Sequence, residues 1–461
     1  MSSETIESTA NTGVVSDYWL ARREQLFWAS CIALIVTAMS FAIRGGLITP
    51  LGKQFSLTNE QLGIITGTAF WGFAITTLIG GWLCDVVGMG RLLALAFVGH
   101  TVSILMTVFA GAFGNGNAFM MLFLGTLAFG LGNGLVEGAC NPLIATLYPD
   151  EKIKRLSRFH MWFPGGIVIG GLVSYAIDKS GVGGKDHNWQ IQFLTMVIPL
   201  LVYGFMFFGK QFPKTERTAS GVSTSEMFKA CLTPLYIIFL LCMFFSSSTE
   251  LVTGQWAPDI LTATTGASGI LILVFINGLM AIGRAFAGDI VHRMSPVAML
   301  IGSAGFSAVG IFLLSKAANA TSAYVAAFIF AIGVCFFWPT MLGVASERFP
   351  RTGALGMSIM GAIGMVSTSI FLPIVGKFKD QGIADFLHLP SADPALTKPF
   401  QDAAAGTPQA AEWAKAQAAG GGAGLHVLVI LPVILFVIFL LIYAYDKSRG
   451  GYKKEILVQD Q

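Results

Sequence analysis

Three ionisable side chains, Arg44, Glu137 and Glu250, lie deep inside long apolar segments of the sequence. A charge at the centre of a membrane span costs about 2.5–3.5 kcal/mol even on permissive insertion scales. Against lipid the three together would cost about 8–10 kcal/mol, which is comparable to the stability of a whole domain. We therefore expect them to face a polar cavity or one another. In such a cavity they could bind the polar groups of a solute, and a desolvated carboxylate could also carry a proton.

Amide, hydroxyl and indole side chains accompany these charges. Asn133, Glu137 and Asn141 are each four residues apart, so they share one face of a helix. Hydroxyl residues at helical spacing form a second polar face around Glu250. Glu137 and Glu250 are the residues predicted to couple to an ion. The full set predicted to bind a substrate is Arg44, Asn133, Glu137, Asn141, Glu250, Gln255, Trp256, Asn277 and Trp338.

This inventory favours a hydroxylated solute, because carboxylates and amides can hydrogen-bond several hydroxyls and flat aromatic rings cover the apolar faces of sugars. Some of these residues also have a structural interpretation. Arg44 and Glu137 could form an ion pair between two helices, and Trp256 and Trp338 could pack in the core. Arg284 lies near the end of its span, where we expect its guanidinium to extend to the interface.

The sequence shows no catalytic residue set and no metal-binding spacing. No cluster of Ser, His and Asp is present, and the six cysteines stand singly in or beside apolar stretches. We therefore predict a protein that is not an enzyme and that has no metal and no cofactor.

The elements that position these residues are predicted to be membrane-spanning helices. Of the 461 residues, 54% are hydrophobic and only 11% are charged, which excludes a soluble enzyme or a nucleic-acid binder. We predict an all-α membrane protein in which twelve transmembrane helices form two pseudo-symmetric six-helix bundles. The predicted spans are about 26–48, 62–84, 91–113, 118–147, 159–178, 191–209, 233–257, 268–288, 297–316, 322–345, 354–376 and 425–445.

Charge placement predicts the orientation and the domain boundaries. Most of the 28 Lys and Arg residues fall on the side of the N-terminal tail, so the positive-inside rule places both termini in the cytoplasm. The predicted parts are a cytoplasmic tail 1–25, a first bundle 26–209, a central cytoplasmic loop 210–232, a second bundle 233–445 and a tail 446–461. Residues 377–424 are predicted to be a long external loop, with a short surface helix over 403–419 and a flexible link at 420–422.

A short motif recurs in the two halves. Gly81, Asp85, Gly88 and Arg91 follow the second span, and Asp289 and Arg293 follow the eighth. Glycine admits a neighbouring helix, and a carboxylate is favoured at a helix N-terminus, so we predict that these six residues form a gate on the cytoplasmic side. Two six-helix repeats around a central loop are typical of a transporter that binds its substrate between the halves at mid-membrane.

At these motifs the sequence resembles the major facilitator superfamily over nearly its whole length. Within it, Glu137 followed by Asn141-Pro142, Thr249-Glu250 with Trp256, and Trp338-Pro339-Thr340 are similar to elements of the fucose–galactose–glucose:proton symporters. The resemblance implies cation-coupled uptake of a monosaccharide by alternating access, with Glu137 contacting sugar or proton. It also implies a monomer in a bacterial inner membrane, with a small molecule, a proton or sodium ion and the lipid bilayer as partners and no nucleic acid.

The sequence departs from that family at Arg44, because the family places an acidic residue at about the position of Gly45. A guanidinium stays charged at ordinary pH and cannot shuttle protons, so Glu250 could carry the coupling, or transport could be sodium-linked or uncoupled. Arg44 also opens a second hypothesis, an organic-anion carrier in which Arg44 binds a carboxylate or phosphate. A third hypothesis is a non-transporting membrane sensor.

Overall fold

A computed structural model describes residues 17–55, 57, 59–112, 114–215, 218, 221–267, 269–286, 294–392 and 394–455. Across these residues the chain is helical, and it contains no strand there. Eleven helical segments in this part of the chain are long and apolar enough to cross a membrane, and a shorter apolar helix, Leu271–Ala285, occupies the position of the predicted eighth span. These segments coincide with the spans predicted from hydropathy, because length and apolar composition alone determine that signal.

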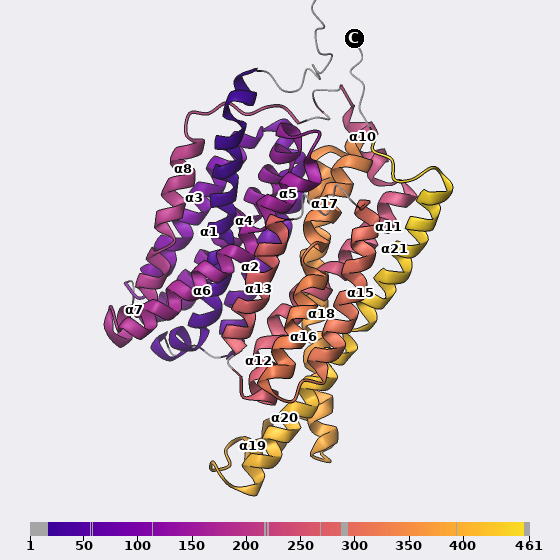
Figure 1. Cartoon of the computed structure of the whole chain (residues 1–461). Helices are drawn as coiled ribbons and strands as arrows, with labels where there is room; N and C mark the ends of the chain where they lie inside the picture. The colour runs from indigo at the N-terminus through magenta and orange to yellow at the C-terminus, as the bar shows by residue number, and fades with distance from the viewer. Residues whose placement is uncertain are drawn as a thin grey trace, which may run out of the picture.

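The first half of the chain forms one helix bundle (Figure 1, indigo to magenta). Its helices are α1 Asp17–Phe55, α2 Asn59–Val86, α3 Met89–Val108, α4 Asn115–Leu147, α5 Lys152–His160, α6 Trp162–Ser180, α7 Gly184–Leu194 and α8 Val197–Phe207.

A connecting segment that carries α10 Thr224–Cys231 leads to the second bundle (Figure 1, pink to yellow). Its elements are α11 Pro234–Ser247, the π-helical turn η1 Ser248–Val252, α12 Thr253–Thr265, α13 Gly269–Ala285, α15 Pro296–Ser315, α16 Ala320–Val334, α17 Phe337–Arg348, the 3-10 turn η2 Pro350–Thr352, α18 Gly353–Phe386, α19 Pro394–Gln401, α20 Pro408–Val427 and α21 Ile430–Ser448.

Three spans are interrupted within the described part of the chain. One span is divided into α5 and α6, another into α16 and α17, and a third contains the π turn η1 between α11 and α12. Pro164 and Pro339 lie in the first turn of α6 and α17, and neither has the backbone N–H that would donate to the carbonyl four residues earlier, which is that of His160 and of Cys335. Such interruptions release backbone carbonyls into the bundle interior, which membrane proteins tolerate only where protein or a cavity satisfies them.

The two halves pack tightly at the end that carries the connecting segment. A methyl group on Gly81 of α2 would overlap the side chain of Ser358 on α18 and lie 2.8 Å from the carbonyl oxygen of Ala354. Lys152 of α5 donates to the carbonyl of Ser346 on α17 (3.2 Å) and is itself buried. Glycine and helix-end contacts thus close this end of the interface.

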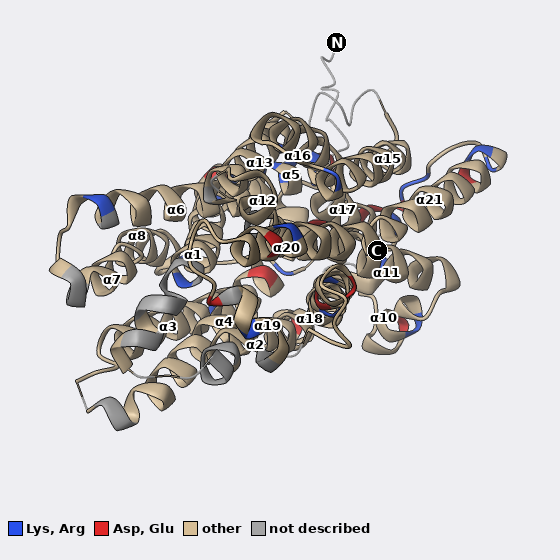
Figure 2. Cartoon of the chain, turned by 90° about the horizontal axis from the view of Figure 1, so that it is seen from below, with Lys and Arg blue, Asp and Glu red and all other residues tan. Residues whose placement is uncertain are grey.

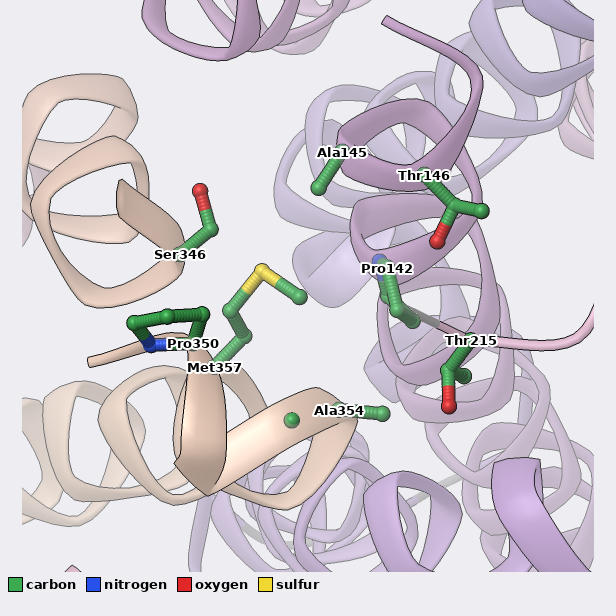
Figure 3. Close-up of a pocket in the computed structure, with 9 residues that line it drawn as sticks. Pro142, Ala145, Thr146, Thr215, Ser346, Pro350, Ala354 and Met357 are labelled. Carbon is green, nitrogen blue, oxygen red and sulfur yellow. The ribbon is translucent and has the colours of Figure 1, made fainter. Parts of the chain in front are cut away.

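Figure 3 shows what remains between the halves there. Pro142, Ala145 and Thr146 of α4 face Ser346 and Met357 of the second half across a cavity of about 20 Å³. That volume holds about one water molecule, so a solute cannot pass.

The predicted external loop 377–424 is largely helical in the structure, and the predicted flexible link at 420–422 is wrong. α18 continues to Phe386, and α20 runs unbroken through the three glycines (Figure 1). A methyl group on Gly420 would overlap the carbonyl of Lys379 on α18, and one on Gly421 would lie 2.6 Å from Ile260 of α12. These glycines therefore allow close helix packing, as small residues do between membrane helices. Figure 2 views the molecule from the end at which α19 and α20 lie, and most residues in this view are uncharged.

Candidate functional site

A small cavity lies between the two halves and brings Glu137, Glu250 and Arg284 together. Its volume is about 20 Å³, enough for about one water molecule. The first half contributes Glu137 from α4, His160 from α5 and Phe163 from α6. The second half contributes Glu250 and Leu251 from η1, Arg284 from α13, Trp338 from α17 and Met365 from α18.

Arg284 is at the centre of this site. Its side chain is 2% exposed, and one terminal nitrogen forms an ion pair of 2.9 Å with Glu250. Its Nε donates to the carbonyl of Cys335 (2.7 Å), and its other terminal nitrogen donates to the carbonyl of His160 (3.0 Å). The expectation that Arg284 extends to the interface is therefore wrong. The ion pair and the two carbonyls hold the guanidinium inside the bundle.

All three partners of Arg284 lie at interruptions of helices. His160 ends α5, Cys335 follows the end of α16, and Glu250 belongs to the π turn η1. The last carbonyls of a helix lack intrahelical partners and carry partial negative charge, so two helix ends supplement the single carboxylate. The broken spans thus build an environment in which a membrane protein can hold a guanidinium.

Glu137 belongs to a second hydrogen-bonded group in the same cavity. The amide nitrogen of Asn141 donates to Glu137 (2.9 Å), and Nε2 of His160 lies 2.9 Å from the amide oxygen of Asn141. Because that oxygen only accepts, His160 must donate from Nε2. Glu137 and Asn141 are one helical turn apart, as the polar face of the sequence predicted.

Two buried polar atoms at the cavity have no hydrogen-bond partner among the residues that the structure describes. The second carboxylate oxygen of Glu250 and the indole nitrogen of Trp338 are both buried and unpaired. A buried polar group without a partner is costly, so such atoms mark where a solute or water is expected to bind.

Arg44 lies away from this cavity. It donates to the hydroxyls of Thr126 (2.6 Å) and Ser103 (2.9 Å), and it lies about 5 Å from the centres of the Phe129 and Phe193 rings. The ion pair with Glu137 that the sequence suggested does not form. The guanidinium is instead stabilised within the first bundle by hydroxyls and aromatic faces.

Asn133 is also buried inside the first bundle, away from the cavity. Its oxygen is 3.0 Å from Nε2 of His100, whose Nδ1 is 3.0 Å from the hydroxyl of Tyr203.

Three further predicted binding residues lie away from the cavity in this conformation. Gln255 is exposed, and the Trp256 indole donates to the carbonyl of Leu372 (3.2 Å). Asn277 donates within its own helix to the carbonyl of Leu273 (2.8 Å). Of the nine predicted residues, Glu137, Glu250 and Trp338 line the cavity and Asn141 supports it.

The predicted gate residues of the first half surround the end of α2. Asp85 accepts from the hydroxyls of Thr215 (2.5 Å) and Thr218 (3.0 Å) in the connecting segment. Gly88 has φ +93°, a conformation that favours glycine, and precedes α3. Arg91 donates to the carbonyl of Val87 (3.5 Å), near the end of α2. Asp289 and Arg293 lie outside the described residues.

Sequence reasoning missed Arg284, His160, Phe163 and Met365 as lining residues. One signal could have found Arg284, because a buried Glu250 requires a counter-ion and few cations lie inside the apolar segments. The other three have no such signal, since only the fold brings them to the cavity.

Comparison with known proteins agrees with this architecture. The model of the Major Facilitator Superfamily matches residues 30–372, so the chain belongs to that superfamily of transporters. It is therefore an integral multi-pass membrane protein that binds small molecules.

Two relatives and one solved structure are similar to this chain over most of its length. The chain is 26% identical to the gentisate transporter of Corynebacterium glutamicum over 79% of this chain and 83% of that protein. It is 22% identical to the sodium-dependent glucose transporter 1A of Mus musculus over 72% of this chain and 88% of that protein. Among solved structures, the proton:xylose symporter bound to a bromodeoxyglucose matches with a TM-score of 0.71 and 17% identity, covering 91% of this chain and 96% of that chain. That last match concerns the fold.

Proposed function

We propose that this protein is a secondary transporter of a small organic carboxylate and that Arg284 binds the carboxylate group. The observation that supports this most is the buried Arg284 guanidinium, which lines the cavity between the two halves. A guanidinium recognises carboxylates through paired N–H donors, whereas neutral sugars are bound through hydroxyls without a permanent charge.

The hydrogen bonds of Arg284 leave donors for a substrate. A guanidinium has five N–H groups. Nε and the two terminal nitrogens each use one N–H, in the bonds to Cys335, His160 and Glu250. One N–H on each terminal nitrogen is left, and a carboxylate can accept hydrogen bonds from such donors.

The walls of the cavity favour a flat, unsaturated acid. Phe163 and Trp338 provide aromatic faces, and Leu251 and Met365 provide apolar contact. The unpaired indole nitrogen of Trp338 can donate to a ring hydroxyl. The gentisate transporter, whose name refers to a hydroxylated aromatic acid, is a relative of this chain.

A substrate enters only after the halves move apart. Ligand pockets for small molecules typically measure about 300–1,000 Å³, far more than the closed cavity. By the positive-inside rule the connecting segment is cytoplasmic, so the tight contacts between α2 and α18 close the inner side. We propose uptake by alternating access, in a bacterial inner membrane, by a monomer that is coupled to protons through Glu137 or Glu250.

A neutral monosaccharide is the second candidate. Glu137, Asn141 and the Trp338 indole offer several hydrogen-bonding groups and one flat ring, as a sugar site requires. Under this alternative Arg284 is a structural cation whose charge is neutralised by Glu250 alone. The two candidates differ in whether the solute itself must be negatively charged.

Counterflow in liposomes that contain the purified protein distinguishes the candidates. Vesicles preloaded with unlabelled gentisate should exchange labelled gentisate, and vesicles preloaded with hexoses should exchange no labelled hexose. Arg284→Gln should abolish this exchange, because it removes the charge. The matched substitution Arg44→Gln should leave substrate affinity close to wild type. Exchange of hexoses but not of carboxylates would refute the proposal, and exchange of neither across a broad panel would favour a sensor.

A further inference from the structure

Glu250 and Arg284 form a buried ion pair with each other, and this pair does not require a substrate. The Glu250 and Arg284 side chains are 8% and 2% exposed and 2.9 Å apart, and both line the central cavity. Oε2 of Glu250 has no hydrogen-bond partner in the described part of the chain, so the guanidinium holds the carboxylate by one oxygen only.

We propose that Glu250 is the internal counter-ion that lets the empty transporter return across the membrane, so that the protein performs net uptake of a carboxylate with a proton rather than obligatory exchange. This inference rests on the proposed function, because it takes Arg284 to be the site of the substrate carboxylate.

The argument begins with the empty transporter. To return, it must close its cavity around Arg284 without a substrate. A guanidinium enclosed without a full negative charge is strongly disfavoured, and the two helix ends at His160 and Cys335 provide only partial charges. Glu250 supplies the missing charge, so the closed empty state is electrically balanced. A transporter without such a carboxylate could close only around a substrate anion, and it would exchange one anion for another.

The loaded transporter presents the opposite problem. A substrate carboxylate on Arg284 places a second negative group beside Glu250, and two carboxylates at one site do not both stay ionised. Glu250 then takes a proton from the side to which the cavity is open. One carboxylate and one proton enter together, so the step is electroneutral. On the other side both leave, and Glu250 pairs with Arg284 again.

Other groups at the cavity have different partners. Glu137 of α4 accepts from Asn141, and His160 of α5 bonds to the same amide. From the remaining lining helices, α17 contributes Trp338 and α18 contributes Met365. The direct contact with Arg284 distinguishes Glu250 from Glu137 as the counter-ion.

The test compares net uptake with exchange in Glu250→Gln, since glutamine keeps the shape of the side chain and removes its charge and proton. We expect gentisate counterflow to persist and to become independent of pH between about 5.5 and 8. Net uptake driven by a proton gradient should fall by about tenfold or more. The control is Thr249→Val on the same turn, since the Thr249 hydroxyl donates to the carbonyl of Phe245 (2.8 Å) and not into the cavity.

Each other outcome has a definite meaning. If Glu250→Gln keeps proton-driven net uptake, Glu250 is not the counter-ion and the inference is wrong. If the variant loses counterflow while gentisate still quenches the fluorescence of Trp338, measured after the other eight tryptophans are replaced, Glu250 is needed for movement of the loaded form, which also contradicts the inference. Loss of both signals would make Glu250 a substrate ligand. If wild type itself exchanges no carboxylate, the proposed function fails instead.

Discussion

Gly81→Ala should loosen the closed end of the interface between the halves. A methyl group there would overlap Ser358 and lie 2.8 Å from the carbonyl oxygen of Ala354, and backbone cannot move away as a flexible side chain can. Overpacking of this kind costs about 1–3 kcal/mol. Because the clash exists only while α2 and α18 touch, that energy shifts the equilibrium toward the open form by about 5–150-fold.

Cysteine labelling measures this shift. Thr146 lines the narrow cavity between the halves in Figure 3 and is 3% exposed, so Thr146→Cys should react slowly with a maleimide. The six native cysteines are buried and would be replaced beforehand. In Gly81→Ala the labelling rate should rise by about the same factor as the open population.

A neighbouring glycine provides the matched control. A methyl group on Gly80 would find its nearest neighbour at 3.6 Å, which is ordinary contact, so Gly80→Ala should label like wild type. Adding Ser358→Gly to Gly81→Ala should recover part of the closed population, because it removes the overlapping side chain. Equal labelling of Gly81→Ala and Gly80→Ala would refute the reasoning, since the clash would then have no effect on the gate.

Three further predictions concern stability. Asp446→Asn should lower the free energy of unfolding by about 3–5 kcal/mol, measured by thermal unfolding in detergent, because it leaves the largely buried Arg348 guanidinium uncompensated. The backbone N–H and the hydroxyl of Ser223 donate to Glu226 and lower its pKa. The stabilisation of α10 by this cap should therefore be complete above the ordinary carboxyl pKa of about 4.3 and be lost as the pH falls through the lowered pKa. Amide hydrogen exchange of residues 224–231 measures this loss. Gly420→Ala should separate α20 from α18 and raise the proteolysis of residues 387–407.

Each of these has a control. Adding Arg348→Met to Asp446→Asn should recover most of the lost stability, and an equal loss in the double variant would contradict the ion-pair argument. Glu226→Ala should remove the pH dependence of exchange in α10, and an unchanged profile would show that another group causes it. Gly302→Ala, which meets nothing within 4 Å, should leave proteolysis unchanged.

The spans could be predicted from the sequence because hydropathy depends only on local composition. The polar face of Glu137 and Asn141 could also be predicted, since both lie on one helix. Partners across helices could not be predicted in this way. Arg44 and Arg284 both lie in apolar segments, and only the fold shows that Arg284 reaches Glu250 while Arg44 turns to hydroxyls.

The glycine-rich segment 420–422 shows a second limit. In a soluble linker such a composition is flexible, and the same residues between membrane helices permit close packing. Local sequence does not distinguish the two cases, because the difference depends on what lies opposite. Here Lys379 of α18 and Ile260 of α12 lie opposite, and both are far away in the chain.

The interrupted helices and the buried arginine depend on each other. Arg284 has two backbone carbonyls as acceptors, and these are available because α5 ends at His160 and α16 ends just before Cys335. An unbroken helix would use those carbonyls internally and leave the guanidinium with Glu250 alone. Since His160 belongs to the first half and Arg284 to the second, this bond must break whenever the halves separate around the site. The fold therefore links the hydrogen bonding of its central cation to the movement that exposes it.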